Sequence, residues 1–270
     1  MINGMKLQKR YMMVLCFLAA GINLYSESVY IYDIKKDIII STLAIGVFGG
    51  SYLLPGTRSG IPNTLNINDV NNFDRGLMFP EHEALHAIRD ITRNIIPVLP
   101  VIVPLSVWGS GGWRFEKKDF DTWLTYGIMY LEALALSFGT VEIIKKNVDR
   151  YRPRSYFANS VGRATSNDCF PSDTTAISFL AASFFSVAFC AEFPESLWKI
   201  PVIAGSYTLA TGIGVLSILS GMHFATDVLV AAAIGSFYGL IIPILHKRLD
   251  DDKRIAVHFT GNGAAVAFKF

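Results

Sequence analysis

The strongest constraint on this chain is a series of apolar runs, each close to the roughly 20 residues that an α-helix needs to cross a bilayer. They lie near residues 38–54, 91–108, 122–144, 174–191, 200–220 and 224–245. With 51% hydrophobic and 17% charged residues in a total of 270, the composition is too apolar for an ordinary soluble domain. Because lipid offers no partner to backbone polar groups, we predict an all-α fold, a membrane helical bundle of about six apolar helices.

Two of these runs carry residues that are unusual in a membrane span. The second run contains Pro97, Pro100 and Pro104, which neighbouring helices accommodate in a membrane but which would break a solvent-exposed helix. Glu132 lies inside the third run, where a carboxylate is a functional candidate by default. Because it precedes Lys145 by more than about three helical turns, we interpret it as part of a polar seam within the bundle.

The two ends of the chain differ from its middle. Lys6, Lys9 and Arg10 precede the apolar stretch YMMVLCFLAAG, which predicts a secretory signal over residues 1–26. The tail IAVHFTGNGAAVAFKF alternates on either side of residues 261–263 and predicts a short C-terminal β-hairpin. The expected divisions are a signal (1–26), N-terminal helices with a polar loop (27–119), a core (120–246) and a tail (247–270).

Three short polar strings stand at the ends of apolar runs. They are Lys145 with Arg152 and Pro153, then Pro171 with Ser172, and then His223 with Asp227. Consecutive antiparallel spans would bring all three strings to one membrane face. A cation cluster, a Ser-led helix start and a His/Asp pair are the parts that a phosphate-handling site needs.

The chemistry of each group fits that use. A neutral imidazole at His223 can attack phosphorus, with Asp227 holding the other ring N–H. Four residues apart on a helix, these two side chains would face one side. Lys145 and Arg152 would neutralise phosphate oxygens. Ser172 would cap a helix whose free backbone N–H groups favour a phosphate.

The same residues also have a purely structural interpretation. Lys145 and Arg152 could be interfacial anchors at a helix end, and His223 with Asp227 could be a structural helix pair. Ser172 is an N-cap under either interpretation. Its contribution to a reaction therefore cannot be separated from its contribution to the helix.

The spacing Lys-x6-Arg-Pro, followed by Pro-Ser and His-x3-Asp, resembles the type 2 phosphatidic acid phosphatase superfamily of lipid phosphatases, soluble acid phosphatases and vanadium haloperoxidases. The resemblance implies a phosphoric monoester hydrolase that acts on a lipid or polyprenyl phosphate through a phospho-histidine. It gives catalytic roles to His223 and Asp227. It gives phosphate binding to Lys145, Arg152 and Ser172. The resemblance implies neither a cofactor nor a metal. Membrane lipids are expected partners, whereas nucleic acid is not, because the chain shows no basic face.

The chain departs from the family pattern in two motifs. The second motif usually reads Pro-Ser-Gly-His, but Asp173 and Thr174 stand at its last two positions, so the histidine that acts as general acid is missing. In the third motif an Arg normally precedes the His by six residues, and here Ser217 stands there. Asp173 is a third catalytic candidate, because a protonated carboxyl could replace the acid; alternatively it only complements the helix dipole. The candidates to supply the missing cation are Arg150, Arg154 and Arg163.

These departures leave two other functions open. The first is a catalytically impaired protein of the same fold that binds lipid phosphates without turnover. The second is a zinc metalloprotease, because the segment from His82 and Glu83 to His86 matches HExxH, with Glu116 as a possible third ligand. We favour an amphipathic interfacial helix as the explanation of the HExxH segment. Cys169 lies in a loop and indicates neither a disulfide nor a metal site.

The orientation in the membrane is not fixed by charge. A cleaved signal followed by six spans would place the motifs in the cytoplasm, whereas the resemblance implies a site on the outer face. Lys and Arg residues are balanced between the two faces. We expect a bacterial inner-membrane protein whose site faces the periplasm, either because the N-terminal run does not set the orientation or because the run at 38–54 does not fully cross.

Overall fold

The computed structural model describes residues 28–30, 34–57, 65–110, 117–157, 167–248, 255–260 and 263–268. The predicted signal sequence lies outside these residues, as do Glu116 and Arg163. Within them, six helical stretches are long and apolar enough to cross a membrane. They are Lys36–Leu53, Glu83–Gly109, Phe120–Asn147, Asp173–Glu192, Lys199–Leu219 and Ala225–His246. The predicted membrane bundle is therefore confirmed.

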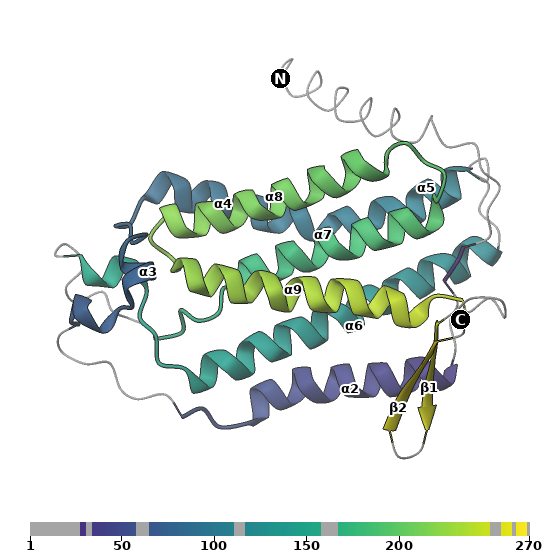
Figure 1. Ribbon diagram of the computed structural model, residues 1–270, viewed down its shortest axis with the longest axis horizontal. Helices are drawn as coiled ribbons and strands as arrows, with labels where there is room; N and C mark the ends of the chain where they lie inside the picture. The colour runs from purple at the N-terminus through teal and green to yellow at the C-terminus, as the bar shows by residue number, and fades with distance from the viewer. Residues whose placement is uncertain are drawn as a thin grey trace.

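Five spans are single helices and one is composite. The single helices are α2 (Ile34–Leu53), α6 (Lys117–Asn147), α7 (Asp173–Glu192), α8 (Lys199–Leu219) and α9 (Ala225–His246). The composite span consists of α4 (Glu83–Ile95), a 3-10 turn η2 (Ile96–Val101) and α5 (Ile102–Ser110). Shorter elements are η1 (Ile67–Asp69), α3 (Asn72–Arg75) and η3 (Pro153–Tyr156). The long helices lie side by side along the length of the molecule (Figure 1).

Prolines explain the composite span. Pro97 stands at the start of η2 and Pro100 lies inside it. Because proline lacks the backbone N–H of the α-helical ladder, the chain passes through a 3-10 segment before α5 begins. The Tyr130 hydroxyl donates a 2.9 Å hydrogen bond to the carbonyl of Pro97, which gives this polar group a partner in apolar surroundings. The composite span begins at Glu83, whereas the apolar run predicted a start near residue 91.

Two glycines allow α9 to pack closely on α7. A Cβ atom at Gly235 would lie 2.0 Å from the carbonyl oxygen of Ala176, and one at Gly239 would lie 2.5 Å from that of Leu180. Small residues at four-residue spacing let helix backbones approach in this way. The contact holds α9 firmly against α7, so the first turns of the two helices lie beside each other.

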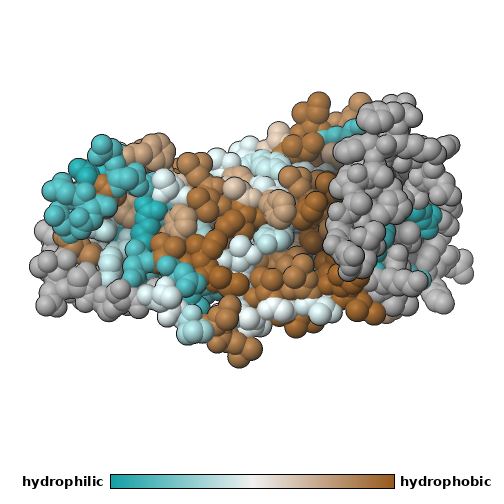
Figure 2. All heavy atoms as spheres, turned by 60° about the horizontal axis from the view of Figure 1, so that its bottom comes forward, coloured by the Kyte–Doolittle hydropathy of each residue, from teal (hydrophilic) through white to brown (hydrophobic). Residues whose placement is uncertain are grey.

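The bundle interior is mostly apolar and aromatic. Phe184 is fully buried and packs edge-to-face against Tyr126 and Tyr130. A polar seam crosses this interior, as predicted for Glu132: its carboxylate accepts a 2.5 Å hydrogen bond from Ser41. The outer surface carries an apolar belt beside a polar end, as Figure 2 shows.

The tail contains two strands. β1 (Ile255–Thr260) pairs antiparallel with β2 (Gly263–Phe268), and Ile255 lies opposite Phe268.

Candidate active site

The three polar motifs meet at one end of the bundle. Lys145 lies in the last turn of α6, Ser172 caps α7, and His223 precedes α9. In Figure 1, α6 ends and α7 and α9 begin at the end of the molecule where α3 lies. Polar residues gather at that same end in Figure 2. The structure thus confirms that the motifs share one face.

His223 presents one ring nitrogen to the interior of the site. Its side chain is fully buried, and Nδ1 lies 2.8 Å from the backbone carbonyl oxygen of Cys169. A carbonyl can only accept, so Nδ1 carries the proton and Nε2 bears the free electron pair. Nε2 is buried and has no hydrogen-bond partner in the part of the chain that the structure describes. A buried, unprotonated and unpartnered nitrogen is suited to attack an electrophile.

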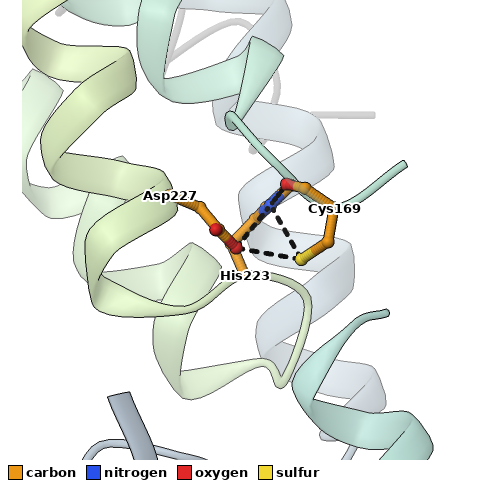
Figure 3. A group of neighbouring side chains, drawn as sticks. All are labelled: Cys169, His223 and Asp227. Atoms are coloured by element: carbon orange, nitrogen blue, oxygen red, sulfur yellow. Dashed lines mark hydrogen bonds and ion pairs between the residues drawn. The ribbon is translucent and has the colours of Figure 1, made fainter. Parts of the chain in front are cut away.

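Asp227 is held differently from the expected helix pair. His223 precedes the N-cap residue Phe224, so it does not share a helical face with Asp227. The carboxylate caps α9 by accepting from the Phe224 backbone N–H at 2.7 Å, and it accepts from the Cys169 thiol at 2.9 Å. Its Oδ2 lies 3.7 Å from His223 Nδ1. As Figure 3 shows, Cys169 joins the two residues, with its carbonyl on the imidazole and its thiol on the carboxylate.

The turn before α9 sets the position of His223. Gly221 has a φ of 71°, in the left-handed region that favours glycine. A Cβ there would lie 2.7 Å from the carbonyl oxygens of Phe79 and Pro80, so the close approach also requires glycine. The backbone N–H of His223 donates to the carbonyl of Ser217 at 3.1 Å. The end of α8 therefore holds the turn that carries the imidazole.

Arg150 and Asp74 form an ion pair that contacts the same turn. The Arg150 guanidinium donates to Asp227 Oδ1 at 2.6 Å, pairs with Asp74 and stacks over Phe224 with 4.4 Å between Cζ and the ring centroid. Asp74 also accepts from the Thr226 backbone N–H at 3.0 Å. Although burial acts in the opposite direction, the hydrogen bonds from Thr226 hold the pKa of Asp74 below its ordinary value. Arg150 is thus a structural cation.

The predicted phosphate-binding residues surround the helix start. Lys145 is buried, and its Nζ lies 3.6 Å from Asp173 Oδ1. Arg152 donates to the carbonyl of Met222 at 3.3 Å and pairs with Asp168 at 3.1 Å. Lys145 therefore contacts the first residue of α7, and Arg152 contacts the residue before His223.

Ser172 is the predicted N-cap of α7. Its Oγ accepts from the backbone N–H of Thr175 at 3.3 Å and from the Thr175 hydroxyl at 2.9 Å. Asp173, the first helical residue, is partly exposed and pairs with Lys145, so it does more than complement the helix dipole.

Burial sets the charge state of the central groups. Desolvation lowers the pKa of His223 below its ordinary 6.5; the hydrogen bond with Asp227 opposes this effect, and the charge of Arg152 adds to it. Burial raises the pKa of Cys169 well above its ordinary value, and the Asp227 carboxylate acts in the same direction. At neutral pH the imidazole is therefore a free base and the thiol is a hydrogen-bond donor.

The chain is similar to known proteins. Residues 126–251 match the model of the PAP2 superfamily. The chain is 29% identical over 200 residues to a lipid A 1-phosphatase of Porphyromonas gingivalis, a match that covers 73% of this chain and 40% of the relative's length. It also aligns with the crystal structure of a transmembrane PAP2 type phosphatidylglycerolphosphate phosphatase from Bacillus subtilis, with 16% identity, a TM-score of 0.47, and coverage of 90% of this chain and 96% of that one.

Thr174 and Ser217, two of the three positions that depart from the PAP2 pattern, share a partner that the sequence interpretation missed. Arg89, in α4, donates from Nε to Ser217 Oγ at 3.0 Å and from Nη2 to Thr174 Oγ1 at 2.7 Å. Its side chain is 3% exposed. Arg89 lies just before the apolar run near residues 91–108, and an ionisable residue that leads into an apolar span is itself a signal of a functional position.

Two of the three expected replacements for the missing PAP2 cation have carboxylate partners of their own. Arg150 is committed to Asp74 and Asp227, and Arg154 pairs with Glu81. Arg163, the third candidate, lies outside the described residues.

The HExxH segment is not arranged as a zinc motif. His82 is the N-cap of α4, where Nδ1 accepts from the Leu85 backbone N–H at 3.4 Å. His86 pairs instead with Asp90 at 3.4 Å. Among the described residues, one group of three or more His, Cys, Asp or Glu side chains could hold a metal, and it is Cys169, His223 and Asp227 within the PAP2 region. Their atoms already serve one another as donors and acceptors.

Proposed function

We propose that the protein is a metal-independent phosphoric monoester hydrolase of the PAP2 kind, with His223 as the nucleophile. The observation that carries this proposal is the buried Nε2 atom of His223, which has no partner among the described residues and lies at the bundle end that carries Lys145 and Arg152. A phosphate held by these cations would face a neutral nitrogen. Electrostatic stabilisation of the phosphoryl group usually provides most of the rate in such transfers.

The reaction then has two displacements. Nε2 attacks phosphorus, the bond from phosphorus to the ester oxygen breaks, and the alcohol leaves with a proton. Water next attacks the phospho-histidine, which releases inorganic phosphate and restores the neutral imidazole. The Cys169 carbonyl holds the Nδ1 proton through both steps, and the Asp227 carboxylate stabilises the positive charge that develops on the ring.

Asp173 is the residue that we propose as the proton donor for the leaving oxygen. In the unliganded site its carboxylate pairs with Lys145. A bound phosphate would compete for Lys145 and would place a second anion beside Asp173. A carboxyl group next to an anion takes up a proton more readily, so substrate binding itself would prepare the acid.

The substrate that we propose is a lipid or polyprenyl phosphate. The site lies at the polar end of an apolar bundle, where a phosphate head group can reach it while the hydrocarbon tail stays in the bilayer (Figure 2). The similarity to a lipid A 1-phosphatase supports a lipid substrate. We also propose an inner-membrane location with the site facing the periplasm.

A second candidate function rests on the substitutions at Thr174 and Ser217. Thr174 cannot act as the acid that the PAP2 pattern places there, and Ser217 carries no charge. A protein with these substitutions could bind lipid phosphates without hydrolysing them.

Phosphate release by the purified protein in detergent separates these functions. The substrates are phosphatidic acid, a polyprenyl phosphate and lipid A. We expect release that chelator does not diminish, and an acid-labile, base-stable phospho-enzyme when labelled substrate is quenched rapidly. Activity that chelator abolishes and zinc restores would favour the HExxH segment, whereas binding without release from any substrate would favour the non-hydrolysing function.

Orientation is tested by labelling single cysteines from outside intact cells. Asn147→Cys, at the motif end of α6, and Leu197→Cys, between α7 and α8, both replace exposed residues. Cys169 is buried and can stay in the background, with Cys16 and Cys190 replaced. We expect an impermeant maleimide to label Asn147→Cys alone; labelling of Leu197→Cys alone would place the site in the cytoplasm.

A further inference from the structure

Arg89 buries a full positive charge between three helices. It belongs to α4, and its side-chain hydrogen bonds reach Thr174 in α7 and Ser217 in α8. Both of these partners are neutral hydroxyl groups. The carboxylate that pairs with it, Asp90, lies 3.0 Å from Nη1 and is itself 44% exposed. Asp90 is also shared with His86, at 3.4 Å. Among the described residues, Asp173 also acts on Arg89 through its charge, but Asp90 is the carboxylate that forms an ion pair with it. A buried guanidinium with one exposed ion-pair partner is suited to bind a further anion.

The guanidinium has donors to spare. Arginine carries five N–H groups in a planar fork. The hydrogen bonds to Ser217, Thr174 and Asp90 use one each from Nε, Nη2 and Nη1. Within the described residues, one N–H on each terminal nitrogen therefore has no partner. Two N–H groups on neighbouring nitrogens are the arrangement that binds two oxygens of one phosphate.

Both hydroxyl partners belong to the candidate active site. Thr174 lies in the first turn of α7, next to Asp173. Ser217 accepts the backbone N–H of His223 through its carbonyl at 3.1 Å, while its hydroxyl receives Arg89. The charge of Arg89 also acts on His223, where it disfavours the protonated ring. Arg89 is thus tied to the helix start on one side and to the nucleophile's turn on the other.

We propose that Arg89 binds the phosphate of the substrate and supplies, from α4, the cation that Ser217 does not supply from α8. This inference rests on the phosphatase function proposed above and adds a third cation to Lys145 and Arg152. Thr174 and Ser217 position the guanidinium. The ligand is a phosphate monoester dianion, whose oxygens suit a bidentate fork.

Removal of the charge tests the assignment directly. Arg89→Gln keeps an amide that can still donate to one hydroxyl, and the matched control is Arg93→Gln, an exposed arginine one turn later on α4. Calorimetric titration with inorganic phosphate should show affinity at least about 10-fold weaker in Arg89→Gln. The value of kcat/KM for phosphatidic acid should fall about 10²-fold. The control should change both quantities far less, because Arg93 acts on Arg89 and Asp173 through its charge, without a hydrogen bond or ion pair to either among the described residues.

A charge swap separates phosphate binding from a structural role. In the double variant Arg89→Ser with Ser217→Arg, the guanidinium returns to the same place from the other helix. We expect phosphate affinity to recover to within about 10-fold of the wild-type value. If Arg89 only joined α4 to α8, the swap would not restore phosphate affinity. That affinity depends on the cation and not on the helix contact.

The outcomes that overturn the proposal are specific. One is a folded Arg89→Gln protein with unchanged phosphate affinity, and another is an equal loss of affinity in Arg93→Gln. If Arg89→Gln does not fold, a folded swap variant without phosphate affinity also overturns it. If no variant and no wild-type protein shows turnover, but phosphate binding still depends on Arg89, the phosphatase function fails while the assignment of Arg89 stands.

Discussion

The two ends of the bundle bury charge in opposite ways. At the motif end, Lys145, Arg89 and Arg152 lie in the same part of the bundle as His223, whose Nε2 has no hydrogen-bond partner among the described residues. At the other end, His246 lies between two carboxylates, with Nε2 at 2.7 Å from Asp37 Oδ1 and 3.2 Å from Glu132 Oε2. Glu192, at the end of α7, is likewise enclosed, because it accepts from Ser28 at 2.5 Å and from Tyr126 at 2.9 Å.

The difference indicates which end serves function. Buried carboxylates that find their partners inside the chain hold helices together and need nothing from outside. Buried cations with unused donors, next to an unpaired nitrogen, are complete only when an anion arrives. We therefore expect variants at the motif end to lose turnover and variants at the opposite end to lose stability.

The largest effect is expected from the nucleophile. His223→Gln should lower kcat for phosphate release by a factor on the order of 10⁴ or more, because no other nitrogen takes the place of Nε2. Thermal unfolding in detergent shows whether the variant is folded. His82→Gln is the histidine-matched control and should keep its activity. Loss of activity in His82→Gln with an active His223→Gln would reverse the roles of the two segments.

Stability should depend more on the opposite end. His246→Leu leaves Asp37 and Glu132 buried without their cation, so the free energy of unfolding should fall by about 3 kcal/mol or more. The KM and kcat of the protein that remains folded should stay close to wild type. Equal stability of His246→Leu and wild type would show that water or lipid head groups reach these carboxylates.

A third variant concerns the one carboxylate within the cationic end. Asp173→Asn should lower kcat for an alkyl phosphate by about 10²-fold, because the leaving alcohol then lacks its proton donor. An aryl phosphate has a more acidic leaving group and should lose far less. Equal losses on the two substrates would count against the acid role, and a lower KM without loss of kcat would show that Asp173 only competes with phosphate for Lys145.

The smallest expected effect is a pH shift. Burial holds the pKa of His223 below 6.5, so the imidazole stays neutral as the pH falls and is protonated only below that value. The acid limb of kcat/KM should therefore have its midpoint below pH 6.5. Arg152→Gln should move the midpoint upward, since the Arg152 charge contributes to the low pKa. A midpoint above pH 7 would mean that Asp227 governs the ring instead.

The bundle could be predicted because its cause is local. Each span follows from a run of apolar residues, and the alternation of spans places Lys145, Ser172 and His223 at one end without any knowledge of packing. The proline-rich run lies within a membrane span, as predicted, although the structure adds the 3-10 turn η2 that the run did not predict. Polar partners of Glu132 were expected for the same reason, since lipid offers none.

The contacts between distant segments could not be predicted. Nothing near Arg89 in the sequence indicates that it meets Thr174 and Ser217, because that meeting depends on how α4 packs against α7 and α8. The carbonyl that holds His223 comes from Cys169, which sequence reasoning had left without a role. Composition and spacing describe single helices, whereas these hydrogen bonds depend on the relative position of several.

The hydrogen bond between Arg89 and Ser217 has an evolutionary consequence. If one guanidinium fills that place, a second one there would meet a like charge, and the absence of both would leave the phosphate short of a cation. Natural selection would then treat the two positions as one inherited unit. Among relatives of this chain, arginine at the position of Ser217 and arginine at the position of Arg89 should be mutually exclusive, and ancestral sequences should show the two exchanges on the same branch.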